Sequence, residues 1–310
     1  NYDGRFDGLV SYEESLSRSL NLPFVWGLQK VGVENFLGML KEMGAANLSD
    51  EPGHYGLSVA AGGIELTPLE LASLYSTLAR GGVYRPLRWS AEQIEVNELR
   101  VFSEGASYLT AHTLKLKDRP DFPARWEYSS MPRDIAWKTG TSFGHRDAWA
   151  IGYGPRHTAE VWMGNVSNKS SSKLLGSASS GPVLFDVLES VADRTNRLED
   201  AAPAPDDLID VEVCSYSGRL VTEACPDSKQ AKAAVSSVPT ETCPYHRHVE
   251  VDLASGLAVQ PGCRGDAETE LRTVLEWPAS IRRWLKDQHR HLPQSPSFAP
   301  ACRAIGGIDG

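Results

Sequence analysis

Apolar residues recur at helical spacing in several segments of the chain. In residues 33–43, a stripe of Phe36, Leu37, Leu40 and Met43 predicts a helix with that face in a core. Ser11, followed by Glu14 three positions later, predicts a capping box at the start of a helix that runs to about Leu20. Thr67-Pro68 predicts another helix start, which Gly81-Gly82 would end. The helices predicted in this way cover residues 11–20, 23–30, 33–43, 68–80, 103–116 and 181–192.

A different pattern occupies residues 135–152. Two short apolar runs, Ile135-Ala136-Trp137 and Trp149-Ala150-Ile151, flank a polar turn with Gly144 near its tip. This pattern predicts an antiparallel hairpin, and residues 160–165 continue it as a third strand. Helices before and after a small antiparallel sheet predict an α+β domain over residues 1–192. We expect Trp137, Trp149 and Trp162 in its core, and the last helix to bury Val183, Leu184, Val187 and Val191. Residues 83–84 and 93–96 are further short strand candidates.

The rest of the chain predicts smaller parts. Residues 193–208 are charged and rich in Ala and Pro, which is typical of a linker. Residues 209–275 form a small Cys-bearing unit with strands near 209–213 and 248–252. Residues 276–310 predict a linker helix at about 281–285 and then coil toward a further domain. The net charge of −9 over 310 residues argues against a nucleic-acid partner, and no run of 18 apolar residues predicts a membrane span.

Candidate chemistry lies at the predicted hairpin, in Lys138-Thr139-Gly140-Thr141-Ser142. One cation and two Thr hydroxyls at the rim of a sheet suit a carboxylate ligand, and the small Gly140 would let a ligand backbone come close. The alternative is a solvated Lys in an ordinary hairpin.

The K-T-G sequence is known together with a nucleophilic Ser in S-x-x-K and with S-x-N or S-D-N. Ser19-Leu20-Asn21 provides an S-x-N upstream, although Ser and Asn at a helix end also serve as plain caps. The one Ser three places before a Lys is Ser170, before Lys173, in a Ser-rich run after K-T-G. That order is wrong for the nucleophile, so we expect a loop at Ser170 and no nucleophile in this chain.

These sequences together resemble the transpeptidase domain of class A penicillin-binding proteins. The resemblance rests on residues 1–4, 17–21, 56–83, 138–142 and 146–152, and it is greatest to the 1C type. It implies the fold shared by penicillin-binding proteins and serine β-lactamases, incomplete here at its N-terminus. It also implies roles: Ser19 relays a proton, Asn21 holds the peptide amide, and Lys138 supplies positive potential. The resemblance also implies that Thr139, Gly140, Thr141 and Ser142 bind the substrate, and that the Thr141 N–H forms half of an oxyanion hole.

The resemblance further implies a bifunctional glycosyltransferase and D,D-transpeptidase that crosslinks peptidoglycan through a serine acyl-enzyme. Its ligands would be the D-Ala-D-Ala stem peptide and β-lactams, with possible cell-envelope protein partners and no cofactor. It implies the periplasmic face of the inner membrane, with the anchor N-terminal to this chain. The chain alone is expected to be inactive. Two alternatives stay open: a non-catalytic peptidoglycan- or partner-binding scaffold, and a carboxypeptidase or β-lactamase, although no deacylating base is identified.

Four cysteines, Cys214, Cys225, Cys243 and Cys263, cluster in the second unit, and Cys302 stands apart. Disulfides, free thiols and zinc are all open. Residues 243–248 form a possible metal half-site, but no second close pair completes it, so we predict no metal. Disulfides are favoured, since the periplasm that the resemblance implies is oxidising. Neighbour pairing would join Cys214 to Cys225 and Cys243 to Cys263.

Overall fold

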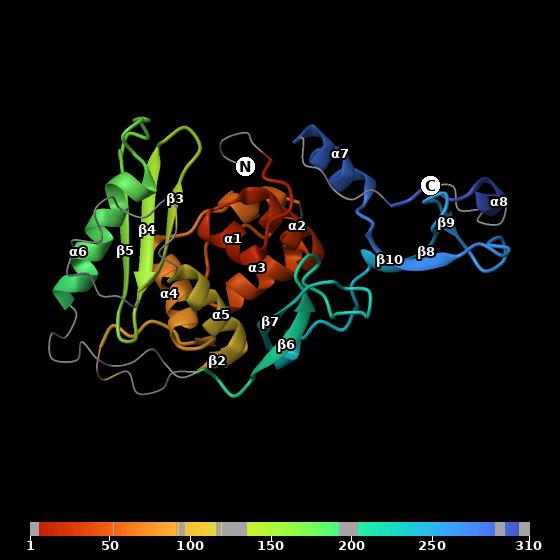
Figure 1. Ribbon diagram of the computed structural model, residues 1–310. Helices are drawn as coiled ribbons and strands as arrows, with labels where there is room; N and C mark the ends of the chain where they lie inside the picture. The colour runs from red at the N-terminus through yellow and green to blue at the C-terminus, as the bar shows by residue number, and fades with distance from the viewer. Residues whose placement is uncertain are drawn as a thin grey trace. The chain divides into compact units, whose positions relative to one another are not determined.

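The computed structural model describes residues 6–51, 53–90, 92, 97–115, 119, 135–191, 204–288 and 295–303. The chain divides into two compact units, Asn1–Leu208 and Ile209–Gly310, each of which is described by itself (Figure 1). The strand expected at 93–96 and most of the linker expected at 193–208 lie outside the described residues. Among the helices that are described, none has the length and apolar character needed to cross a bilayer.

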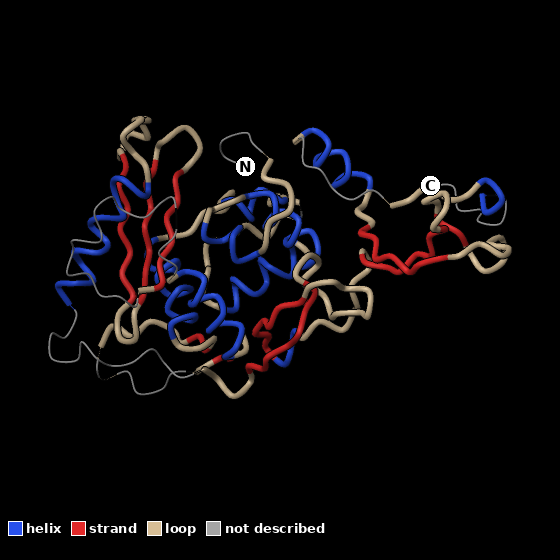
Figure 2. The backbone as a smooth tube through the Cα atoms, in the orientation of Figure 1, coloured by secondary structure: helices blue, strands red, loops and turns tan. Residues whose placement is uncertain are grey.

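The first unit is built on a three-stranded antiparallel sheet in the order β3-β4-β5. Helix α6 covers one face of this sheet, and α4 and α5 lie on the other, so that the sheet is the middle layer (Figure 1 and Figure 2). This arrangement confirms the predicted α+β class. The helices are α1 (Tyr12–Ser17), α2 (Asn21–Val31), α3 (Val33–Glu42), α4 (Pro68–Ala79), α5 (Glu104–Leu114) and α6 (Gly181–Val191). The strands are β1 (Val83–Tyr84), β2 (Leu99–Arg100), β3 (Ala136–Thr141), β4 (Asp147–Tyr153) and β5 (Thr158–Gly164).

Capping side chains set the starts of α4 and α1. The Glu70 N–H donates to Thr67 Oγ1 (3.2 Å), and Glu70 Oε2 accepts from the Thr67 N–H (2.8 Å), which makes a complete capping box on α4. On α1, Ser11 Oγ accepts from the Glu14 N–H (3.0 Å) as predicted. The Glu14 carboxylate pairs with Arg18 instead of returning to the cap, and α1 ends at Ser17, before the predicted Leu20.

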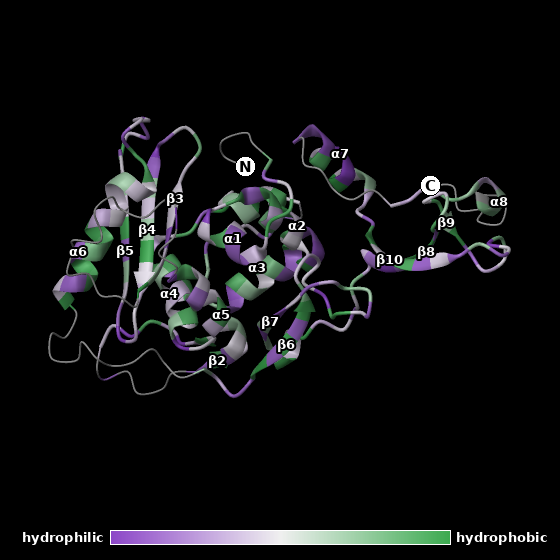
Figure 3. Ribbon diagram, in the orientation of Figure 1, coloured by the Kyte–Doolittle hydropathy of each residue, from purple (hydrophilic) through white to green (hydrophobic). Residues whose placement is uncertain are grey.

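One core cluster lies between the sheet and α6. It contains Trp137 from β3 and Leu184, Phe185 and Leu188 from α6, and the Trp137 and Phe185 rings meet edge to face at 5.0 Å. The predicted burial of α6 was right only for Leu184. The stripe of Val183, Val187 and Val191 is 36–45% exposed, because it lies one position round the helix from the buried stripe. Figure 3 shows both hydrophobic and hydrophilic residues along α6.

The three tryptophans of the sheet differ in environment. Trp137 is buried as predicted, whereas Trp162 is 41% exposed, so the expectation of a core position for Trp162 was wrong. The Trp162 Nε1–H donates to Asp147 Oδ1 (3.0 Å), which keeps the polar edge of the indole at the end of the hairpin. Trp149 is half-buried beside it, with ring centroids 6.3 Å apart.

The described residues of the second unit form two small sheets. Strands β6 (Leu208–Cys214) and β7 (Ser228–Ala234) form one, and β10-β8-β9 form the other (Figure 2). The bounds are β8 (His246–Asp252), β9 (Ala258–Val259), β10 (Thr269–Leu275), α7 (Ala279–Asp287) and α8 (Pro300–Arg303). The strands predicted at 209–213 and 248–252 are therefore present as β6 and β8.

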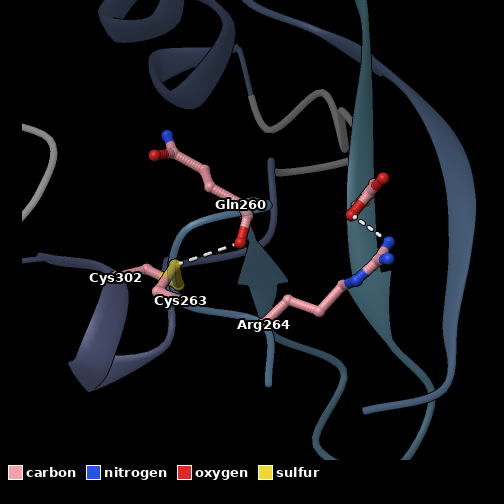
Figure 4. Close-up of a disulfide and its surroundings, with 5 residues drawn as sticks. Gln260, Cys263, Arg264 and Cys302 are labelled. Carbon is pink, nitrogen blue, oxygen red and sulfur yellow. Dashed lines mark hydrogen bonds and ion pairs between the residues drawn. A yellow bond between two sulfur atoms is a disulfide. The ribbon is translucent and has the colours of Figure 1, made fainter. Parts of the chain in front are cut away.

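The disulfide of this unit joins Cys263 to Cys302, so the predicted pairing was wrong (Figure 4). Cys214, Cys225 and Cys243 carry no disulfide. Phe298 forms a β-bridge with Ala258, beside the disulfide. The segment 295–303 is thus fastened to the Cys-bearing unit, which the prediction of a coil linker after residue 275 did not anticipate.

Candidate active site

The centre of the site is a contact between two residues that are 119 positions apart. The Lys138 Nζ donates to Ser19 Oγ (2.7 Å) and to the Thr139 carbonyl oxygen (2.8 Å). Lys138 lies in β3, and its neighbour Trp137 packs on the α6 side, so the pleat turns Lys138 to the other face. The two sequences that resemblance linked, S-x-N and K-T-G, are therefore side by side in the fold.

Ser19 is held in an uncommon backbone conformation. Its φ is +58°, in the left-handed region that residues with a Cβ rarely adopt. The Ser19 N–H donates to Leu16 O (3.2 Å) and the Leu20 N–H to Ser15 O (2.8 Å), which fixes the turn after α1. Strain of this kind is concentrated at functional sites, where the surrounding structure maintains it.

Asn21 is half-buried and is the first residue of α2. The prediction placed Ser19 and Asn21 together at the end of one helix. In the structure the S-x-N sequence instead spans the turn between two helices, with the buried Leu20 as the N-cap residue of α2. The turn therefore directs Ser19 toward β3, while Asn21 already has a helical backbone.

The hydrogen-bond alternation of β3 determines which backbone groups reach its open edge. The Ser142 N–H donates to Asp147 O (3.0 Å) on the partner strand side. In an antiparallel pair the bonded residues alternate, so the main-chain groups of Thr139 and Thr141 point away from β4. Two carbonyl groups agree with this alternation, because they bind side chains and not β4. Trp137 O accepts from Arg119 Nη1 (2.8 Å), and Thr139 O accepts from Lys138 Nζ. The Thr141 N–H thus points to the edge of the sheet.

The remaining residues of the predicted binding group support the strand and the turn. Thr141 Oγ1 accepts from the Gly176 N–H (3.0 Å), and Ser142 Oγ accepts from the Asp147 N–H (2.8 Å). Asp147 therefore shapes the hairpin. Gly140 is exposed, and a Cβ there would meet only Trp149 Cβ, at an ordinary 3.6 Å. Because Gly140 has no side chain, nothing projects from β3 at this position.

Two supporting residues were not found from the sequence. A Cβ on Gly176 would lie 2.6 Å from Gly140 O and 2.8 Å from Trp149 O, so the backbone at Gly176 packs directly on β3 and β4. Arg119 is buried with its guanidinium 4.1 Å from the Trp137 ring centroid, and its Nη1 also donates to Leu114 O (3.0 Å). Both residues fix β3 beside Lys138, and neither belongs to a recognisable local pattern.

Ser170 and Lys173 lie in the loop after β5, as predicted. The loop is attached to the tip of the hairpin, because the Ser171 N–H donates to His145 O (2.9 Å). Ser170 is thus not at the start of a helix, where the nucleophile of this motif set is expected.

The family model described as the penicillin-binding protein transpeptidase domain matches residues 1–189. The chain belongs to this family. A second model, for the second linker domain of penicillin-binding protein 1C, matches residues 243–292. The identification made from the sequence motifs is therefore confirmed.

Curated relatives and a solved structure agree with the family. The chain is 28% identical to penicillin-binding protein 1C of Escherichia coli over 99% of its own length and 40% of the relative's. It is 32% identical to penicillin-binding protein 1F of Bacillus subtilis over 64% of this chain and 29% of that protein. The fold is similar to the crystal structure of penicillin-binding protein 1A from Haemophilus influenzae, with a TM-score of 0.61, 18% identity, and coverage of 78% of this chain and 42% of that one. The chain thus spans less than half of each of these proteins.

Proposed function

We propose that this chain provides the carboxylate-binding and proton-relay part of a serine-type D,D-transpeptidase that crosslinks peptidoglycan. The observation that carries the proposal is the hydrogen bond from Lys138 Nζ to Ser19 Oγ. A cation in contact with a hydroxyl can stabilise that oxygen while a proton passes through it.

The proposed chemistry uses groups at the edge of β3. The Oγ of a nucleophilic Ser of the whole protein attacks the D-Ala-D-Ala carbonyl carbon. Its proton passes through Ser19 to the leaving amine, and an acyl-enzyme forms. The Thr141 N–H, which points to the edge of the strand, donates to the developing oxyanion. Lys138 and the Thr139 and Thr141 hydroxyls attract the terminal carboxylate, and Asn21 holds the peptide amide.

The family of the chain supports a wider proposal for the whole protein. We infer that it combines this transpeptidase with a glycosyltransferase, acts at the periplasmic face of the inner membrane, and binds β-lactams as analogues of the acyl donor. No cofactor is required by this mechanism. Without an S-x-x-K serine before the S-x-N sequence, the 310-residue chain by itself forms no acyl-enzyme.

Covalent labelling by a fluorescent penicillin tests the proposal. The full-length protein should label, and Lys138→Ala should lower the labelling rate about 100- to 1000-fold, as loss of one preorganised electrostatic donor does. Lys173→Ala is the matched control and should label at the wild-type rate, because Lys173 lies in the loop after β5.

Three results would count against the proposal. Equal labelling of wild type and Lys138→Ala would remove the role assigned to Lys138. A full-length protein that binds stem peptide but never labels would instead be a peptidoglycan-binding scaffold. Labelling of the 310-residue chain at Ser170 would show that the nucleophile had been placed wrongly.

A further inference from the structure

Four potential metal ligands meet in the second unit. Cys214 ends β6, Cys225 lies in the following loop, Cys243 precedes β8, and His246 begins it. The three sulfur atoms and a His nitrogen all lie within 4.8 Å of one another. This set, called the Cys3His cluster below, lies entirely within the second unit.

The spacing within the cluster fits a tetrahedral ion. His246 Nδ1 is 3.4 Å from Cys214 Sγ and 3.4 Å from Cys243 Sγ. Zinc bond lengths of about 2.3 Å to sulfur and 2.0 Å to nitrogen place two such ligands about 3.5 Å apart in a tetrahedron. His246 is therefore already at the separation from Cys214 and from Cys243 that a bound zinc would require, and Cys225 Sγ lies within 4.8 Å of all three.

The backbones of the three cysteines are fixed by one short segment. The Cys214 N–H donates to Arg219 O (2.8 Å), and the Cys243 N–H donates to Leu220 O (2.8 Å). The Cys225 N–H donates to Thr222 O (2.9 Å). Residues 219–222 thus hold all three ligand segments in register, which is the preorganisation that a structural metal site needs.

Two of the sulfur atoms have backbone N–H donors beside them. The Thr222 N–H donates to Cys225 Sγ (3.4 Å). Cys243 Sγ accepts from the N–H groups of Tyr245 and His246, within the turn Cys243-Pro244-Tyr245-His246. Hydrogen bonds of this kind orient the ligands of a metal site.

Burial and cysteine number both argue against ordinary thiols. Cys214, Cys243 and His246 are at most 6% exposed, and the Tyr216 ring covers His246 edge to face at 5.2 Å. After Cys263 pairs with Cys302, three cysteines remain, and one disulfide among them would leave a single thiol. A Cys3His zinc site uses all three and the histidine.

We propose that the Cys3His cluster is a structural zinc site that fastens the β6–β7 sheet to the β8 sheet. Zinc replaces the three thiol protons, which are released to solvent, and His246 binds as the neutral imidazole through Nδ1. Among these residues only Cys243 and His246 are close in sequence, which is why the spacing predicted no metal. The fold supplies the other two ligands.

Metal content tests the proposal directly. The 310-residue chain, purified under reducing conditions, should hold about one zinc per chain. Cobalt bound in its place should give the absorption of a tetrahedral ion with thiolate-to-cobalt charge transfer. A substoichiometric, weakly held metal or an octahedral cobalt spectrum would overturn the site.

Matched variants locate the ligands. His246→Ala should weaken zinc binding at least about 100-fold, the upper end of what loss of an outer-shell partner already costs. His248→Ala, two positions along β8 and exposed, should bind zinc as the wild type does. Cys243→Ser should lose the metal, whereas Cys302→Ser should retain it. Equal binding by His246→Ala and His248→Ala would contradict the assignment.

A second measurement covers the case in which a ligand variant fails to fold. Zinc removed from the wild-type chain by a chelator should abolish hydrogen-exchange protection in residues 208–252, and zinc but not magnesium should restore it. A metal-free chain with a disulfide among Cys214, Cys225 and Cys243, and with full protection, would show that the cluster is a redox pair instead.

Discussion

The Lys138–Ser19 contact of the first unit and the Cys3His cluster of the second are both long-range assemblies, yet only the first was predictable. Each half of the first is a short contiguous sequence, and K-T-G and S-x-N are known together in a fixed order. The ligands of the second are separated by loops with no fixed spacing, and only Cys243 and His246 form a near pair. A set of short contiguous motifs thus reveals a site in the sequence, whereas ligands that come from separate segments with no fixed spacing leave little trace in it.

The two units also differ in how they are stabilised, and the largest predicted effect tests this difference. Replacement Cys302→Ser should lower the stability of the second unit by about 4 kcal/mol, because the disulfide closes a loop with a sequence separation of 39. The stability of the first unit should not change, because that unit is stabilised by large buried side chains such as Trp137 and Leu184. Hydrogen exchange of peptides from β8 and β10, compared with peptides from β4, measures both units in one experiment.

The control for this prediction is the double variant Cys263→Ser/Cys302→Ser. Both single changes remove the same bond, so the double variant should be no less stable than either single variant. Unchanged exchange of β8 and β10 in Cys302→Ser would mean that the covalent link contributes nothing to the second unit.

A buried carboxyl gives a smaller effect, confined to the first unit. Both Glu160 oxygens are buried without a hydrogen-bond partner among the described residues, and desolvation raises the pKa of Glu160 to about 7. Burial and the charge of Glu160 also raise the pKa of Tyr75, on α4, to about 12. Because the folded chain keeps a proton that the unfolded chain releases, stability should fall as the pH rises from about 4.5 to about 7.

Glu160→Gln removes this dependence. The variant should be more stable than the wild type by roughly 1–2 kcal/mol at pH 8, allowing for partial solvent screening, and the advantage should vanish near pH 4. Urea unfolding at a series of pH values checks it, with the exposed Glu34→Gln as control. An advantage that is the same at pH 4 and pH 8 would show that the effect is one of packing.

The parts of the fold that the sequence predicted are those set by local rules. The helix start at Thr67-Pro68, the hairpin at 135–152 and the order of the helices follow from residues that are close together in the chain. The buried face of α6 could not be predicted from such local rules. Val183, Val187 and Val191 form an apolar stripe beside the stripe that is buried, and only contact with the sheet distinguishes the two stripes. Gly176, Arg119 and the Cys263–Cys302 bond depend in the same way on partners that sequence spacing does not indicate.

The smallest predicted effect separates chemistry from backbone strain at Ser19. Ser19→Ala and Ser19→Gly both remove the hydroxyl that meets Lys138, so both should lower penicillin labelling of the full-length protein to the same extent. Only glycine relieves the φ of +58°, so Ser19→Gly should be more stable than Ser19→Ala by about 1 kcal/mol. At Ser15, within α1, the order should reverse and alanine should be the more stable by about 0.5–1 kcal/mol. If Ser19→Gly were instead the less stable of the pair, the left-handed turn would carry no strain, and its place at the site would say nothing about function.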